Sequence, residues 1–211
     1  MTATVHIRMA VEDALSETVL RRVLAGRVLA DRPVQYEIGV VYNKGGSDCL
    51  RKKAGAFNNM AKAGPFLLLT DLDQHSCPTE LVTTWLSGKH KHDFFLFRVA
   101  VREVESWLLG DMVRLKSFLH LKNTSAMPAP EALPDPKKEL LKLALRSPVR
   151  RVREALVRRD EKSGCLFQGP DYNGELAHFV AKQWDISTAR RACPSLERLF
   201  AALQRLEAKL P

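Results

Sequence analysis

The stretch "FLLLTDLDQHSCP", residues 66–78, begins as an apolar run that is typical of a strand buried on both faces, and it continues into two aspartates. Asp71 and Asp73 are separated by one leucine, so in an extended chain their side chains share a face. Two carboxylates on one face repel each other unless a cation or a proton offsets the charge. The end of this strand therefore indicates either a turn or a cation site.

The segments on both sides of this stretch repeat a pattern of strand followed by helix. Further strands are expected at 4–11, 34–42 and 93–101, and helices at 15–30, 47–63, 77–88 and 103–121. Strands that alternate with helices at short spacing predict a parallel sheet with helices on both faces. The expected fold is thus an α/β fold with a mostly parallel four-stranded sheet.

A proline-rich segment, "KNTSAMPAPEALPDPKKE" at 122–139, predicts a linker after about residue 121. The chain beyond it reads as helices separated by proline and glycine. We therefore expect an α/β domain at 1–121 and a helical C-terminal part at 122–211 that packs on it. Helices in this part are expected at 136–147, 148–159, 174–184 and 195–210.

The positive charge of the chain is concentrated in its C-terminal half. Of a net charge of +9, residues 1–111 hold 14 Lys and Arg against 13 Asp and Glu, and residues 112–211 hold 19 against 11. The C-terminal half is therefore the better candidate for contact with a polyanion. Four dispersed cysteines and the lack of a long apolar run favour a cytoplasmic protein that does not enter a membrane.

Acidic residues follow three of the expected strands. Glu12 follows the first strand, Asp71 and Asp73 the third, and Glu105 the fourth. In a parallel α/β sheet, ligands bind beyond the carboxyl ends of the strands, so these acids are expected at one edge. Mg²⁺ or Mn²⁺ is the expected cation, and such a metal serves phosphodiester hydrolysis. Singly, each acid is also explained as a helix cap, a turn residue or part of a solvated first turn.

Three segments around these acids resemble the TOPRIM domain shared by topoisomerases, primases and OLD-type nucleases. They are "AVEDALSE" at 10–17, "LLLTDLDQHSCPTEL" at 67–81 and "FRVAVREVESWLLGD" at 97–111. Together with the helical tail they are similar to a bacterial TOPRIM-like family of unknown function that is often linked to ABC-type ATPases. The resemblance spans nearly the whole chain.

The resemblance implies a Rossmannoid fold and a role for each acid. Glu12 corresponds to the TOPRIM glutamate and Asp71 and Asp73 to its DxD motif, while Glu17 and Glu105 match further acids of OLD-type nucleases. Glu12, Asp71, Asp73 and Glu17 would then ligate Mg²⁺ or Mn²⁺, and Glu105 would be a further catalytic acid. This sequence departs from the usual pattern by placing Asp after the glutamate and one extra residue before Glu17.

By the same resemblance the protein is expected to be a nuclease effector in an ATPase-linked antiviral defence system. The sequence has no GxxxxGK[ST] motif, so the ABC-type ATPase would be a separate partner protein. A homo-oligomer is a further candidate assembly. The alternatives are a non-catalytic TOPRIM-like module that binds an ATPase and nucleic acid, and a receiver-like phosphotransfer domain.

Two basic segments are candidates for binding the nucleic acid. The first follows the second strand, and the second lies in the C-terminal half; their cations are Lys44, Arg51, Lys52 and Lys53, and Arg150, Arg151, Arg153 and Arg158. Arginine and lysine bind phosphate oxygens, and arginine does so through two parallel hydrogen bonds. A flexible loop with solvated helix faces, or contact with an acidic protein, explains the same residues.

Overall fold

The computed structural model describes residues 3–25, 27–29, 32–43, 45–122 and 127–209. The chain divides into two compact units. The sheet unit comprises Met1–Val101 and Ser195–Pro211, and the helical unit comprises Arg102–Pro194. The boundaries of these units differ from those of the domains expected from the sequence, 1–121 and 122–211. The expected domain boundaries stay a prediction.

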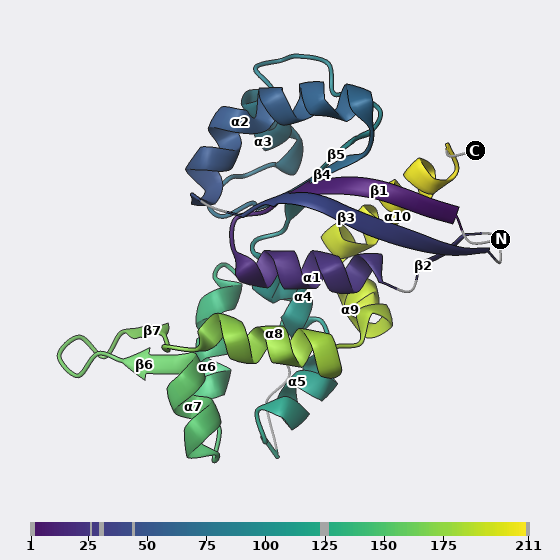
Figure 1. Ribbon diagram of the computed structural model, residues 1–211. Helices are drawn as coiled ribbons and strands as arrows, with labels where there is room; N and C mark the ends of the chain where they lie inside the picture. The colour runs from purple at the N-terminus through teal and green to yellow at the C-terminus, as the bar shows by residue number, and fades with distance from the viewer. Residues whose placement is uncertain (1–2, 26, 30–31, 44, 123–126, 210–211) are drawn as a thin grey trace. The chain divides into compact units, whose positions relative to one another are not determined.

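The sheet unit is built on a five-stranded sheet in the order β2-β3-β1-β4-β5 (Figure 1). β3, β1, β4 and β5 are parallel, which confirms the expected four-stranded parallel sheet, and β2 adds an antiparallel edge strand beside β3. The strands are β1 (Ala3–Ala10), β2 (Arg27–Leu29), β3 (Arg32–Tyr42), β4 (Phe66–Asp71) and β5 (Phe95–Ala100).

Helices cover both faces of this sheet (Figure 1). On one face lie α2 (Gly46–Met60) and α3 (Pro78–Trp85), with the short η1 (Ala61–Ala63) between α2 and β4. On the other face lie α1 (Ala14–Leu24) and α10 (Pro194–Glu207). The order of the strands explains why both faces are covered. The chain moves one way across the sheet from β1 to β3 and the opposite way from β3 to β4 and β5. Because such connections are right-handed, the helix after β1 lies on one face and the helices after β3 and β4 lie on the other.

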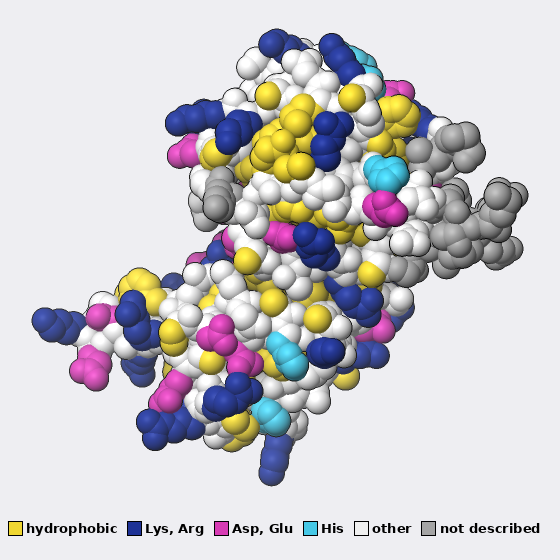
Figure 2. Space-filling view, viewed as in Figure 1, with side chains coloured by type: hydrophobic (Ala, Val, Ile, Leu, Met, Phe, Trp, Pro, Cys, Tyr) yellow, Lys and Arg dark blue, Asp and Glu magenta, His cyan; other side chains and the backbone are white. Residues whose placement is uncertain are grey.

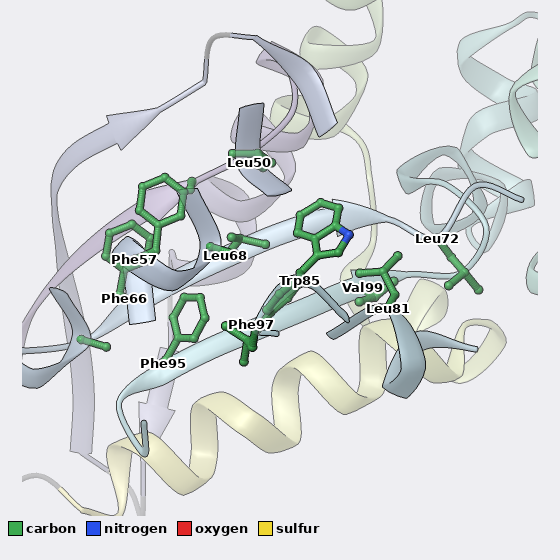
Figure 3. Close-up of a cluster of buried hydrophobic side chains, with 14 residues drawn as sticks. Leu50, Phe57, Phe66, Leu68, Leu72, Leu81, Trp85, Phe95, Phe97 and Val99 are labelled. Atoms are coloured by element: carbon green, nitrogen blue, oxygen red, sulfur yellow. The ribbon is translucent and has the colours of Figure 1, made fainter. Parts of the chain in front are cut away.

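The apolar core between the sheet and α2 and α3 is rich in aromatic rings (Figure 3). Phe57 of α2 stacks on Phe66 of β4 with ring centroids 4.8 Å apart, and Trp85 of α3 contacts Phe97 of β5 at 5.4 Å. β4 is buried along its whole apolar stretch, as expected for a strand covered on both faces.

The helical unit contains short helices and one hairpin of two strands. Trp107 and Trp184 are both buried in it, and the indole N–H of Trp184 donates to the carbonyl of Trp107 at 3.2 Å. The elements are α4 (Val104–Leu109), α5 (Met112–Phe118), η2 (Pro130–Ala132), α6 (Pro136–Leu145), α7 (Arg150–Leu156), β6 (Val157–Arg159), β7 (Leu166–Gln168), α8 (Tyr172–Lys182) and α9 (Ile186–Ala192).

Three of the expected helices end or break well before the residue predicted from the sequence. The helix expected at 15–30 ends at Leu24, and the chain returns as β2. The helix expected at 103–121 is interrupted at Gly110, because the buried Asp111 caps the following helix by accepting from the N–H of Arg114. The helix expected at 148–159 ends at Leu156, where the chain pairs with β7.

Candidate functional site

The carboxyl ends of β1 and β4 lie side by side in the sheet. Ala10 of β1 is in register with Leu68 of β4, so the residues after each strand emerge next to each other. β1 connects to β3 on one side, whereas β4 connects to β5 on the other. The pair therefore forms the topological switch point, the crevice where ligands bind in open α/β sheets.

Glu12 and Asp71 are joined across this switch point. One carboxylate oxygen of Glu12, Oε1, accepts a hydrogen bond from the backbone N–H of Asp71 at 2.9 Å and another from the hydroxyl of Thr70. The other oxygen, Oε2, accepts no hydrogen bond from the described residues. The structure thus brings the predicted residues Glu12 and Asp71 together and leaves one oxygen of Glu12 for a further contact.

Glu12 lies in an environment that disfavours its negative charge. Burial raises the pKa of its carboxyl above the usual value, and the negative charges of Asp73 and Asp13 raise it further. The hydrogen bonds from Thr70 and Asp71 act in the opposite direction and do not overcome the effect of burial. A cation beside Glu12 would relieve this cost.

The two aspartates of the DxD motif differ in exposure and in backbone conformation. Asp71 ends β4 and is half-buried, while Asp73 is exposed and has a φ of 49°, in the left-handed region. Leu72 between them is buried, and its N–H donates to the carbonyl of Ala100 at 2.9 Å. The N–H of His75 donates back to the carbonyl of Leu72, so the segment after β4 is a tight turn.

Asp13 and Glu17 have structural partners at the start of α1. Asp13 is the N-cap of the helix and accepts from the N–H of Ser16 at 2.8 Å. Glu17 accepts from the side-chain amide of Asn43, just after β3, at 2.6 Å and from Arg21 at 2.8 Å. Both oxygens of Glu17 are therefore engaged, and its predicted role as a metal ligand stays a prediction.

The metal expected from the sequence would have to be held by Glu12 together with Asp71 or Asp73. No group of three or more His, Cys, Asp and Glu side chains is arranged to hold a metal ion within residues 3–25, 27–29, 32–43, 45–122 and 127–209. Mg²⁺ commonly uses one or two carboxylates and completes its shell with water. Glu12 together with Asp71 or Asp73, at the carboxyl ends of β1 and β4, would supply these one or two carboxylates.

A pocket of about 360 Å³ adjoins the DxD turn in the sheet unit. Arg51 of α2 and His75 of the turn both line it, together with Glu80 and Trp85 of α3. Arg51 pairs with Asp48 at 3.1 Å, and both side chains are largely exposed. The pocket therefore places one of the predicted phosphate-binding cations beside the turn that carries Asp73.

The other cations of the first basic segment lie on α2. Lys52 and Lys53 are exposed. Gly45, the N-cap of α2, has a φ of 98°, and a Cβ there would meet the side chain of Cys49 at 2.7 Å, so glycine is required. Lys44 lies outside the described residues.

Glu105 belongs to the helical unit, where it is buried in the first turn of α4. It accepts a hydrogen bond from the hydroxyl of Tyr172 at 2.9 Å, and its carboxylate lies 3.6 Å from the ammonium of Lys137. Burial raises the pKa of Glu105 to about 6, and Glu103 adds repulsion that the attraction to Lys137 opposes. Its expected place beside Asp71 stays a prediction.

The arginines of the second basic segment make contacts within the helical unit. Arg150 pairs with Glu154 at 2.8 Å, Arg151 with Glu175, and Arg153 donates to the carbonyl of Ser147 at 2.6 Å. Arg158 lies over the ring of Phe167 at 5.9 Å in the β6–β7 hairpin. Figure 2 shows this hairpin with Lys and Arg interspersed with Asp and Glu, so its charge is mixed.

Thr70 and Asn43 were not identified from the sequence. Thr70 donates a hydrogen bond to Glu12, and Asn43 donates one to Glu17. Thr70 is a buried hydroxyl at the end of an otherwise apolar strand, and it donates to Glu12. A single polar residue within a buried strand needs a hydrogen-bond partner, so a partner for Thr70 could have been predicted from the sequence. Asn43 had no comparable signal, because its partner lies on a helix 26 positions earlier.

Comparison with models of known protein families, with curated proteins and with solved structures finds no match for this chain. Throughout the part of the chain that the structure describes, no helix has the length and apolar character needed to cross a bilayer.

Proposed function

We propose that this protein is a metal-dependent nuclease that hydrolyses phosphodiester bonds of DNA or RNA. The observation that carries the proposal is the position of Glu12, Asp71 and Asp73 after two adjacent parallel strands, at the switch point of the sheet. The raised pKa of Glu12 adds to it, because the cause is burial beside other carboxylates. A divalent cation would offset this negative charge.

Mg²⁺ or Mn²⁺ would be held by Oε2 of Glu12 and by Asp71 or Asp73. Such an ion polarises a phosphodiester and lowers the pKa of a bound water, which supplies the nucleophile at neutral pH. Thr70 and the N–H of Asp71 hold the Glu12 carboxylate in one orientation. Arg51, in the adjoining pocket, would bind a phosphate of the substrate.

The TOPRIM resemblance of the motifs supports the same activity and a wider role. On that basis we infer that the protein is the nuclease effector of an antiviral defence system with a separate ABC-type ATPase. The cations Lys52 and Lys53 on α2, and Arg158 on the hairpin of the helical unit, would add contacts to the nucleic acid backbone.

A second candidate function is a non-catalytic module that binds nucleic acid and an ATPase partner. It is favoured by the lack of a group of three metal-ligating side chains among the described residues. In this case the hydrogen bonds of Glu12 to β4 would serve only to fix the two strand ends. Such a module would bind nucleic acid without cleaving it.

The test uses purified protein with plasmid DNA, a single-stranded DNA oligonucleotide and tRNA, in Mg²⁺ or Mn²⁺ and in EDTA. We expect metal-dependent cleavage of at least one substrate. Asp71→Asn and Glu12→Gln should lower the rate by about a hundredfold or more, because each removes a charged oxygen that would hold the metal. Binding of Mn²⁺, measured by electron paramagnetic resonance, should weaken in the same variants.

Glu37→Gln is the matched control, since Glu37 is an exposed acid on β3 whose carboxylate pairs with His6 at 3.0 Å. It should keep wild-type cleavage and Mn²⁺ binding. If the wild type neither binds Mn²⁺ nor cleaves any substrate, the nuclease proposal fails. Nucleic acid binding that survives in Asp71→Asn would then support the non-catalytic module.

A further inference from the structure

The sheet unit contains a second hollow, of about 210 Å³, between β5 and α10. Figure 3 shows α10 running alongside β5. We call the carboxyl ends of β1 and β4, with Glu12, Asp71 and Asp73, the acidic edge. The hollow shares no residue with this edge or with the pocket of about 360 Å³ beside it. Four cations line the hollow, Lys91, Arg98, Arg205 and Lys209, together with one carboxylate, that of Asp93.

Arg98 is the central cation of this hollow. Side chains alternate along β5: Phe97 and Val99 belong to the aromatic core on the α2 face, so Arg98 between them faces α10. Its Nε atom is buried and has no hydrogen-bond partner among the described residues. Burial lowers the pKa of Arg98, and the nearby charges of Arg205 and Arg198 lower it further. A buried donor without a partner is costly, and here the donor belongs to a charged group.

The hollow has too few carboxylates to neutralise its cations. The ammonium of Lys91 donates to the carbonyl of Phe95 at 3.1 Å, and its pKa is lowered by burial and then by the charge of Arg98. Asp93, the one carboxylate among the residues lining the hollow, pairs with Lys209 at 2.7 Å. An excess of positive charge therefore remains in the hollow once this pair is counted.

We propose that this hollow is a binding site for a phosphate group. A phosphate oxyanion carries up to two negative charges and accepts several hydrogen bonds, so it can satisfy the guanidinium of Arg98 and reduce the repulsion among the cations. Arg205, which is exposed on α10, would contact the anion from the other side. The size of the hollow fits one phosphate group, either as free phosphate or as the phosphate of a mononucleotide.

The site lies apart from the acidic edge of the same sheet. Its β5 residues precede Ala100, the register partner of Asp71, by two to five positions. At about 3.3 Å per residue, that is roughly 7–17 Å along the strand. The phosphate proposal therefore does not depend on the metal site.

The test measures binding of inorganic phosphate and of AMP by isothermal titration calorimetry at constant ionic strength, with chloride replaced by the anion. We expect one site in the wild type. Arg98→Gln and Arg205→Gln should each weaken binding by about tenfold or more, the usual effect of losing a charged hydrogen bond. Arg205 is exposed, so this variant keeps the test valid even if the substitution of Arg98 impairs folding.

Arg22→Gln is the matched control, because it removes the same charge from an exposed position on α1. It should bind phosphate as the wild type does. If AMP binds at least as tightly as phosphate, the natural source is a nucleotide, and if it binds more weakly, the source is the free anion. The proposal is overturned if the wild type does not bind phosphate at constant ionic strength, or if Arg22→Gln weakens binding as much as Arg205→Gln.

Discussion

Glu105→Gln should change the pH dependence of folding stability. Glu105 is buried in the helical unit, and its pKa is about 6 against a usual value of 4.5. The substitution removes the titrating group but keeps a carbonyl oxygen that can accept from the hydroxyl of Tyr172. Lys137 keeps a second carboxylate, since Glu103 lies 3.8 Å from its ammonium.

The sign and size of the effect follow from this pKa. Because the folded state binds the proton of Glu105 more tightly than the unfolded state, the stabilisation is present below pH 4.5 and is lost as the pH rises through 6. A shift of about 1.5 pKa units corresponds to about 2 kcal/mol. The free energy of unfolding of the wild type, relative to that of Glu105→Gln, should therefore fall by about 2 kcal/mol between pH 4 and pH 7.

Urea unfolding followed by tryptophan fluorescence at intervals from pH 4 to pH 7.5 measures this difference directly. Trp107 and Trp184, buried in the helical unit, report on its unfolding. Glu154→Gln is the control, because Glu154 is exposed in the same unit and its difference from the wild type should vary little with pH. Curves for the wild type and Glu105→Gln that stay parallel over this range would refute the reasoning.

Four substitutions at three positions test the backbone conformations of the chain. Asp73→Asn and Asp73→Ala should both weaken Mn²⁺ binding, but only alanine should lower the unfolding free energy, by about 1 kcal/mol, because of the φ of 49°. Gly55→Ala, in open space within α2, should raise the unfolding free energy by about 0.5–1 kcal/mol. Gly169→Ala should lower it by about 1–3 kcal/mol, since the new Cβ would lie 2.3 Å from the carbonyl oxygen of Ala155. Denaturant unfolding measures the stability of all four variants, and electron paramagnetic resonance measures Mn²⁺ binding by the two Asp73 variants.

The parallel sheet could be predicted because its strands carry local signals. The runs at Phe66–Asp71 and Phe95–Ala100 are apolar over almost their full length, which is typical of strands buried on both faces. The helices between them have apolar residues at helical spacing, so the alternation of strand and helix was visible without tertiary information. This alternation, together with the right-handed crossover rule, leaves few arrangements of the sheet.

The elements that were missed depend on pairing between distant residues. β2 pairs with β3, and β6 pairs with β7, through backbone hydrogen bonds that leave no periodic signal in three residues. In the segment "VRR" at 157–159 the arginines also suit a helix, so the local pattern favoured continuing α7. Tertiary context, here pairing with Leu166–Gln168, decided against it.

The acidic edge could be anticipated in part. The rule that ligands bind beyond the carboxyl ends of parallel strands predicted that Glu12 and Asp71 would meet, and a hydrogen bond joins them. The partners of Glu17 could not be predicted, because they depend on how the end of β3 approaches the first turn of α1. Arg98 could have been noticed, since it is a charged residue within an otherwise apolar strand.

Two groups of like charge therefore lie in one sheet unit without neutralising each other. Carboxylates gather where β1 and β4 end, and cations gather between β5 and α10. Each group holds a partly buried member whose charge is disfavoured, Glu12 in one and Arg98 in the other. Stability alone would favour pairing such residues with each other or replacing them by apolar ones, and the ligands of opposite charge that we propose for the two sites would account for their separation. The two proposed sites share no residue, so the stabilisation that a metal ion would provide at one should add to that which a phosphate would provide at the other.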